Sequence, residues 1–139
     1  MSDRPEPQRP VETPREWLRY AEEDFSVAER ERQSQRPAYH TICFLCQGAA
    51  EKFLKGYLIA QGWTLEKTHD VLALIELCAD YDAHLGAMVA EGATLNEYIV
   101  AGRYPGDIAF EEIGEAETDE ALEATQRIRA RVKKLMQGQ

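Results

Sequence analysis

One of the side chains best suited to chemistry in this sequence is a histidine directly before a predicted helix. Thr68-His69-Asp70 precedes an apolar stretch, and the free N–H groups and positive dipole of a helix N-terminus favour anions such as phosphate. The imidazole of His69 could donate to such a phosphate, or act as a general acid or base. Capping of the helix by Thr68 and Asp70 explains the same residues, so capping and anion binding both stay open.

A second candidate is Arg103, which lies in a stretch too rich in proline and glycine to be helical. We expect a long loop over residues 102–114, in which Pro105 fixes the bend after Tyr104. A guanidinium can hold a phosphate or a carboxylate with two hydrogen bonds, and long loops often carry functional residues. Arg103 and Tyr104 are therefore candidate ligand-binding residues.

Four polar residues cross an otherwise apolar stretch at helical spacing. His40, Gln47, Glu51 and Lys55 follow one another at steps of seven, four and four, which places them along one line of a helix. One interpretation is an ordinary ion pair between Glu51 and Lys55 at the edge of a bundle, with His40 a satisfied histidine near the helix start. The other is that the line borders a groove or a self-association surface, because polar groups on a central helix cost stability unless they find partners. On this second interpretation His40, Glu51 and Lys55 are candidate ligand-binding residues.

The three cysteines are predicted to be small core residues. Cys43 and Cys46 lie three apart on an apolar helical stretch, and Cys78 ends another. The first two have a spacing that zinc sites use, but the sequence offers no second pair of ligands. We therefore expect no metal site.

The apolar periodicity predicts an all-α fold, a bundle of four or five helices. Thr13-Pro14-Arg15-Glu16 has the form of a capping box with proline at the first helical position. We expect Thr68 and Thr118 to cap the third and the last helix, and we find no strand pattern. The predicted helices span residues 13–31, 37–61, 68–78, 83–100 and 118–136. Residues 1–12 are predicted to be a disordered tail, and residues 13–139 to form one domain.

Charge and hydropathy exclude two classes of partner. A net charge of −9 opposes nonspecific DNA binding, which depends on many basic contacts to phosphate. Seven acids and no base lie between residues 111 and 123, and five bases between residues 127 and 134, an order that suits the dipole of the last predicted helix. No apolar run approaches the roughly 20 residues that cross a bilayer, and the first residues lack the core of a secretory signal. We therefore expect a cytoplasmic protein without membrane contact.

Three blocks of the sequence, taken together in their order and spacing, resemble the HEPN domain family. They are Cys43–Lys55, Lys67–Val71 and Arg103–Pro105, and the likeness extends over about residues 14–136. The resemblance implies an α-helical up-and-down bundle that commonly forms homodimers. It also implies a prokaryotic type often encoded beside a minimal nucleotidyltransferase in toxin–antitoxin pairs, and the family name refers to proposed nucleotide binding.

The resemblance implies ribonuclease activity only for members that carry a further motif. Many HEPN toxins are metal-independent endoribonucleases whose active site is an Arg separated from a His by four to six residues. The guanidinium holds the scissile phosphate while the imidazole moves the 2′-hydroxyl proton. In this sequence the positions where such a histidine would follow Arg103 hold Ile108, Ala109 and Phe110, and the arginines before His40 also miss the spacing. We therefore do not carry this activity over.

Three functions remain as expectations. The first is a HEPN homodimer that binds a nucleotide or an RNA phosphate near His69 and Arg103, and that works with a nucleotidyltransferase partner. The second is a divergent endoribonuclease that uses His69 or His40 in place of the missing histidine. The third is a protein that only interacts, through the helix at residues 37–61, with itself or with a partner. We favour the first, without a cofactor and without catalysis by the chain itself.

Overall fold

The computed structural model describes residues 13–99 and 113–137, and all regular structure in these ranges is helical. The predicted tail at residues 1–12, together with Arg103 and Tyr104 in the predicted loop, lies outside the described residues. Six helices are described: α1 Pro14–Arg32, α2 Tyr39–Ala60, α3 Val71–Cys78, α4 Ala83–Gly86, α5 Val89–Asn96 and α6 Glu115–Met136. The prediction of an all-α fold is confirmed.

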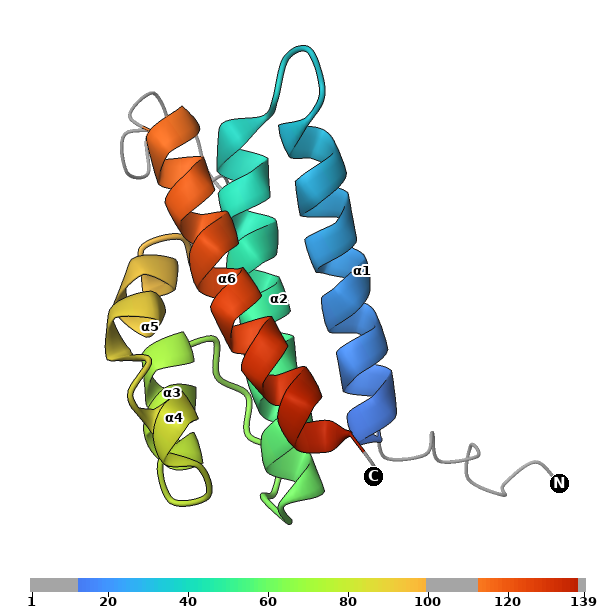
Figure 1. Ribbon diagram of the computed structural model, residues 1–139, viewed down its shortest axis with the longest axis vertical. Helices are drawn as coiled ribbons and strands as arrows, with labels where there is room; N and C mark the ends of the chain where they lie inside the picture. Colours follow the sequence, from blue (N-terminus) through green and yellow to red (C-terminus); the bar gives the residue numbers. More distant parts are fainter. Residues whose placement is uncertain (1–12, 100–112, 138–139) are drawn as a thin grey trace, which may run out of the picture.

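The helices form a bundle in which the third member is broken into short pieces. Figure 1 shows α1 and α2 running in opposite directions, and α6 running alongside α2 in the same direction as α2. The short helices α3, α4 and α5 lie together on one side and contact α2 or α6. None of the described helices is both long and apolar enough to cross a membrane.

The first two helices pack closely and form the largest interface of the bundle. The predicted capping box is confirmed, because the Glu16 N–H donates to Thr13 Oγ1 at 3.2 Å and the Thr13 N–H donates to Glu16 Oε1 at 3.1 Å. A Cβ placed on Gly56 would lie 3.1 Å from the Cβ of Trp17, so glycine lets the two backbones approach. The buried stripe of α1, formed by Ala21, Phe25 and Ala28, packs in the core with α2.

The predicted helix at residues 83–100 is instead two helices separated by a turn. Helix α4 ends at Gly86, and α5 begins at Val89 without a side-chain cap from Met88. A Cβ on Gly86 would lie 2.8 Å from the Cα of Ala79, so this turn packs directly against the end of α3. The break follows from tertiary packing, which the apolar periodicity of the sequence did not indicate.

Two predicted helix starts are also wrong. The N-cap of α3 is Asp70 rather than Thr68, and its carboxylate accepts a hydrogen bond from the Ala73 N–H at 3.0 Å. Helix α6 begins at Glu115, and Thr118 is a fully buried residue of its first turns, 3.7 Å from the Cys43 sulfur. Thr118 therefore contributes to the core and does not cap the helix.

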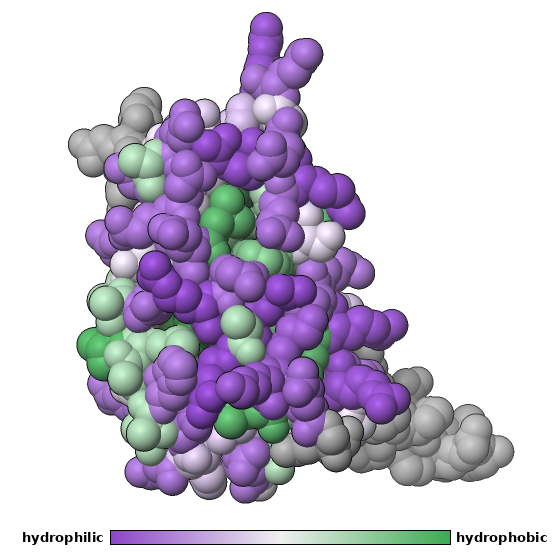
Figure 2. Space-filling view, viewed as in Figure 1, coloured by the Kyte–Doolittle hydropathy of each residue, from purple (hydrophilic) through white to green (hydrophobic). Residues whose placement is uncertain are grey.

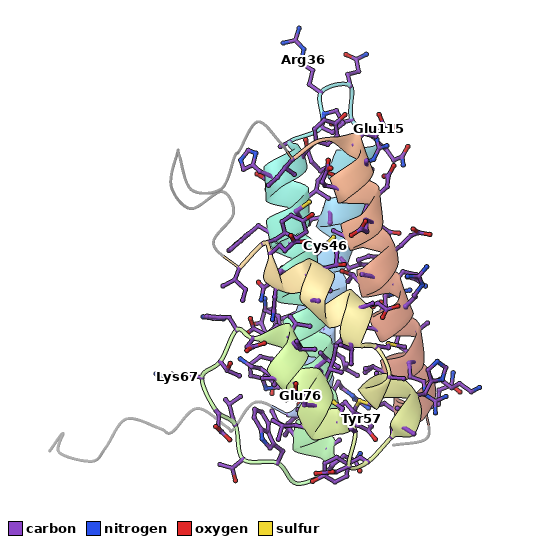
Figure 3. All side chains as sticks on the ribbon, turned by 90° about the vertical axis from the view of Figure 1, so that its left-hand side faces the viewer. Arg36, Cys46, Tyr57, Lys67, Glu76 and Glu115 are labelled. Carbon is purple, nitrogen blue, oxygen red and sulfur yellow. The ribbon has the colours of Figure 1, made fainter. Side chains whose placement is uncertain are left out.

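The prediction of core cysteines is confirmed. Cys43, Cys46 and Cys78 are free thiols with no exposed surface, and Figure 3 shows Cys46 within the bundle. Burial raises the pKa of Cys43 to about 11, and that of Cys46 and Cys78 to about 12. Since the thiolate is the reactive and metal-binding form, these residues serve packing at neutral pH.

The charges of α6 are arranged as the helix dipole favours, and several of them also join helices. The acids Glu115 and Glu117 lie in its first turn, and Lys133 and Lys134 in its last. Arg131 binds both oxygens of Asp82, at 3.0 and 2.7 Å, which ties α6 to the start of α4. The basic residues between positions 127 and 134 therefore suit the helix dipole and also form contacts between helices.

Candidate functional site

Three of the predicted site residues meet in one buried network. Lys55 Nζ donates to Glu51 Oε2 at 2.8 Å, and His69 Nδ1 lies 2.9 Å from Glu51 Oε1. Both oxygens of this carboxylate are therefore engaged by a cationic or a titratable group. The polar line predicted on α2 consequently includes the expected ion pair, but the pair is buried and shared with a histidine from the α2–α3 connection.

The side chain of Gln47 binds the backbone of His69. Its amide nitrogen donates to the His69 carbonyl at 2.9 Å and to Glu51 Oε1 at 3.3 Å. Gln47 and Glu51 lie one helical turn apart on the same face of α2. Gln47 binds the backbone of His69, and Glu51 binds its ring. The position of the imidazole is thus set by a central helix rather than by its own loop.

Backbone N–H groups at the start of α3 donate to side chains of the protein itself. This favours capping over anion binding at these groups. The Asn96 amide accepts from the Val71 N–H at 2.8 Å and donates to Asp70 Oδ1 at 2.8 Å. Asp70 also accepts from Ala73, and these contacts, led by the Ala73 N–H, lower the pKa of the carboxyl. The N–H groups of Val71 and Ala73 are therefore occupied beside a carboxylate, and the structure shows capping at this helix start.

The imidazole is the part of the network that reaches solvent. The side chain of His69 is 61% exposed, against 10% for Glu51 and 5% for Lys55. Because an ionised carboxylate only accepts hydrogen bonds, Nδ1 of His69 must donate to it. In the neutral ring Nε2 is then the acceptor, available to a proton or a donor group, and in the protonated ring it becomes a donor.

The buried carboxylate of Glu51 stays ionised through its partners. Burial by itself would raise its pKa, but hydrogen bonds from Lys55 and His69 outweigh this and hold the pKa below its ordinary value. A carboxyl whose pKa is lower in the folded chain stabilises the fold at pH values above its unfolded pKa. That stabilisation is lost as the pH falls through the lowered, folded-state pKa.

An aromatic ring covers the inner end of the network. The Lys55 ammonium lies 5.6 Å from the centre of the Trp17 ring, which allows a cation–π contact. The Trp17 Nε1 atom is buried and has no hydrogen-bond partner among the described residues. The network therefore links α1, α2 and the α2–α3 connection.

His40, another predicted site residue, is not part of this network. His40 lies eleven residues before Glu51 on α2, which is about 16 Å along a helix axis, and its Nε2 lies 3.2 Å from the Thr41 hydroxyl. Arg103 and Tyr104 lie outside the described residues. Figure 3 shows Lys67 on the outer side of the α2–α3 connection, close in sequence to His69.

Sequence reasoning missed Asn96, which fixes the start of α3. The residue ends α5, twenty-six positions away from Asp70, and no local pattern marks such a long-range amide contact. Gln47 had a signal, its place on the polar line of α2, although its bond to the His69 carbonyl was not predictable. No group of three side chains suited to holding a metal ion occurs in residues 13–99 and 113–137.

Removing Lys55 tests whether the network is buried and coupled. We expect Lys55→Met to lower the free energy of unfolding by about 3 kcal/mol, because it leaves the Glu51 carboxylate buried with an incomplete set of partners. Lys52→Met is the matched control. Lys52 pairs with Asp24 on the neighbouring helix, and this pair is more exposed, with side chains 31% and 25% exposed. We expect that loss to be below about 1 kcal/mol.

The double variant Lys55→Met/Glu51→Leu separates pairing from packing. It should recover most of the lost stability, since an apolar pair replaces an ion pair of similar volume. Urea unfolding followed by circular dichroism measures all of these variants. Equal losses in the Lys55 and Lys52 variants would contradict the network described above.

Comparisons with known proteins place the whole bundle in one family. The family model for the HEPN domain matches residues 14–135. A crystal structure of ST0689, described as an archaeal HEPN homologue, is 25% identical with a TM-score of 0.71, covering 90% of this chain and 98% of that chain. A crystal structure of TT1696 from Thermus thermophilus is 27% identical with a TM-score of 0.71, covering 89% of this chain and 98% of the other.

The search of curated proteins found no match. The family model nevertheless covers all six described helices, from the first residue of α1 to the last turn of α6. The matched segment also contains Gln47, Glu51, Lys55 and His69, the residues of the buried network. The chain belongs to the HEPN domain family.

Proposed function

We propose that the protein is a HEPN-domain binding module that engages a nucleotide or an RNA phosphate through His69. The observation that carries this proposal is an exposed imidazole whose ring and backbone are both held by buried polar residues of α2. A side chain fixed in this way loses little conformational entropy when a ligand binds. This favours a recognition role for His69 over a purely structural one.

Charge balance around the carboxylate favours an anionic ligand. The Lys55 ammonium offsets the charge of Glu51, so protonation of His69 gives the trio a net positive charge at its solvent-facing end. A phosphate oxygen accepting from Nε2 would stabilise the protonated ring, and Lys67 lies two residues away in an exposed position. The ligand would contact the imidazole, since the N–H groups of Val71 and Ala73 are already bonded.

The assembly state and the partner rest on the family resemblance. We propose that the chain acts as a homodimer, together with a minimal nucleotidyltransferase in a toxin–antitoxin-like pair. Arg103 and Tyr104 complete the proposed ligand site as sequence-based candidates. What supports them is the Arg103–Pro105 block, which lies within the segment that the family model matches.

Calorimetric titration with ATP and with a short single-stranded RNA tests the binding proposal. We expect His69→Ala to weaken binding about tenfold, the cost of losing one hydrogen bond to a charged group. His40→Ala is the matched control, since it removes the same ring at a position outside the network, and it should leave the affinity unchanged. Heats unaffected by both His69→Ala and Arg103→Ala would overturn the proposed site.

A divergent endoribonuclease is the second candidate, favoured by the Glu51–His69 pair. A carboxylate on Nδ1 orients an imidazole so that Nε2 can act as a general base, as in other catalytic carboxylate–histidine pairs. Here Nε2 would take the proton of an RNA 2′-hydroxyl. The 2′-oxygen would attack the adjacent phosphorus to give a 2′,3′-cyclic phosphate, and the bond from phosphorus to the 5′-oxygen would break as that oxygen takes a proton from water.

Incubation of the purified protein with transfer RNA and messenger RNA distinguishes the two functions. If the chain is a nuclease, cleavage should require His69, fall strongly in Glu51→Gln, and stop when the 2′-hydroxyls are replaced by hydrogen. RNA that stays intact for hours at high protein concentration would exclude this candidate and leave the binding module.

A further inference from the structure

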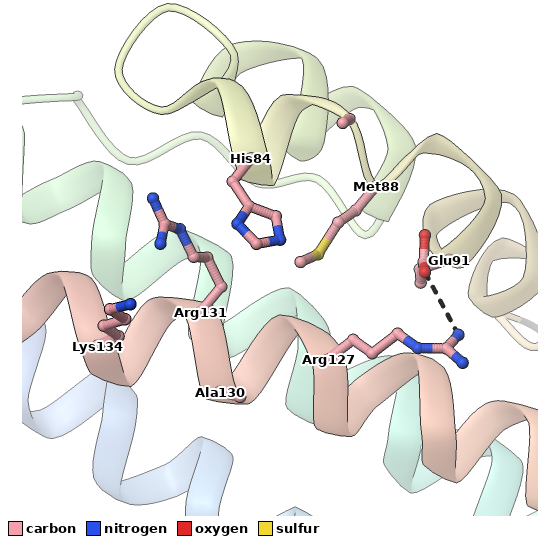
Figure 4. A pocket seen from close by; sticks show the side chains of 8 residues that line it. His84, Met88, Glu91, Arg127, Ala130, Arg131 and Lys134 are labelled. Atoms are coloured by element: carbon pink, nitrogen blue, oxygen red, sulfur yellow. Dashed lines mark hydrogen bonds and ion pairs between the residues drawn. The ribbon is translucent and has the colours of Figure 1, made fainter.

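A groove lies between α6 and the turn that joins α4 to α5, on residues that no motif singled out. It has a volume of about 490 Å³. The groove exists because the third member of the bundle is broken at residues 87 and 88, so that no continuous helix covers this part of α6. Figure 4 shows side chains from both walls pointing into the gap.

Cations dominate the α6 wall. Arg127, Arg131 and Lys134 follow one another at steps of four and three, which places them on one face of the helix. His84 points into the groove from the opposite wall, and Glu91 is the acid among the lining residues. A protein with a net charge of −9 thus presents a locally basic face here.

The cations differ in how far they are already neutralised. Arg131 is fixed by both oxygens of Asp82, which uses its Nε and one terminal nitrogen and leaves the other N–H groups of the guanidinium. Arg127 has one 3.4 Å contact to Glu91 and one 3.9 Å contact to Glu123. No ion pair of Lys134 occurs within the described part of the chain, so its charge is the least satisfied of the three.

The floor of the groove is apolar. Met88 projects into it and is 8% exposed, and Ala87 and Ala130 complete the surface. Figure 2 shows hydrophobic residues gathered over α4 and α5, beside the hydrophilic side chains of α6. A flexible thioether between two small residues accepts apolar groups of varied shape.

We propose that this groove binds a small organic phosphate ester, with its phosphate on Lys134, Arg131 and His84 and its apolar body on Met88. The volume lies within the range of small-molecule sites, roughly 300 to 1,000 Å³. A phosphate offers up to two charges and three acceptor oxygens, which suits three donors on two walls. A carboxylate, with one charge and two oxygens, satisfies fewer of them.

The site is separate from the one proposed around His69. Its hydrogen-bond donors come from α6 and α4, whereas the network at His69 is built by α2 and the α2–α3 connection. It therefore gives the bundle a second anion site whose ligand is selected partly by an apolar group. Binding there should be independent of His69.

Methionine methyl NMR tests the proposal, because the sequence has three methionines and Met88 is the one in the groove. We expect phenyl phosphate to shift the Met88 methyl signal saturably, while the signals of Met1 and Met136 stay in place. Inorganic phosphate and benzoate should each bind about tenfold more weakly, since each lacks one half of the recognised group. An unmoved Met88 signal would overturn the site, and equal affinity for benzoate or for inorganic phosphate would overturn the phosphate-ester class.

Two variants separate a built site from general electrostatic attraction. Lys134→Gln should weaken phenyl phosphate binding about tenfold. Lys133 directly precedes Lys134 in the chain, and it pairs with Glu22 of α1. Lys133→Gln removes the same charge and should leave phenyl phosphate binding unchanged. Equal weakening by both variants would overturn the proposal.

Filling the groove tests the apolar contact without changing charge. Ala130 is exposed on α6 and leucine is a good helix former, so Ala130→Leu should fold while blocking the floor. In Ala130→Leu, phenyl phosphate should no longer shift the Met88 methyl signal. In His69→Ala, phenyl phosphate should shift that signal as it does in the wild type. Full binding by the Ala130→Leu protein, or lost binding in His69→Ala, would contradict a separate groove site.

Discussion

The rest of the structure depends on one buried carboxylate. Glu51 lies on the central helix α2 with its side chain 10% exposed, where an unpaired charge would cost several kcal/mol. Lys55 satisfies one of its oxygens, and Gln47 and His69 satisfy the other. Because this carboxylate must be paired, the connection between α2 and α3 packs against α2. This contact determines the position of His69.

That constraint is completed by packing from the other side. Asn96 at the end of α5 binds both the first N–H of α3 and the carboxylate of Asp70, so the chain around His69 is held by α2 and by α5. The third member of the bundle is broken at residues 87 and 88, between α4 and α5. This break leaves the groove open beside α6. One arrangement of short helices thus yields a fixed imidazole and an open basic face.

Local sequence signals predicted the elements, and long-range contacts decided the details. The capping box at Thr13, the stripe of α1 and the core cysteines could be predicted, since each depends on neighbours within a few turns. The split of residues 83–100 and the cap at Asp70 could not, because they follow from contacts with Ala79 and Asn96. The polar line of α2 was visible in the sequence, yet its burial and its bond to His69 were not.

The tautomer of His69 is the most direct test of this account. If the Glu51 carboxylate holds the ring, long-range nitrogen–proton NMR at alkaline pH, where imidazoles are neutral, should find the proton on Nδ1. Ordinary solvent-exposed histidines favour the proton on the other nitrogen. A wild-type ring protonated on Nε2, or a tautomer unchanged in the Lys55→Met/Glu51→Leu variant, which removes the acceptor, would contradict the claim that a buried carboxylate positions this imidazole.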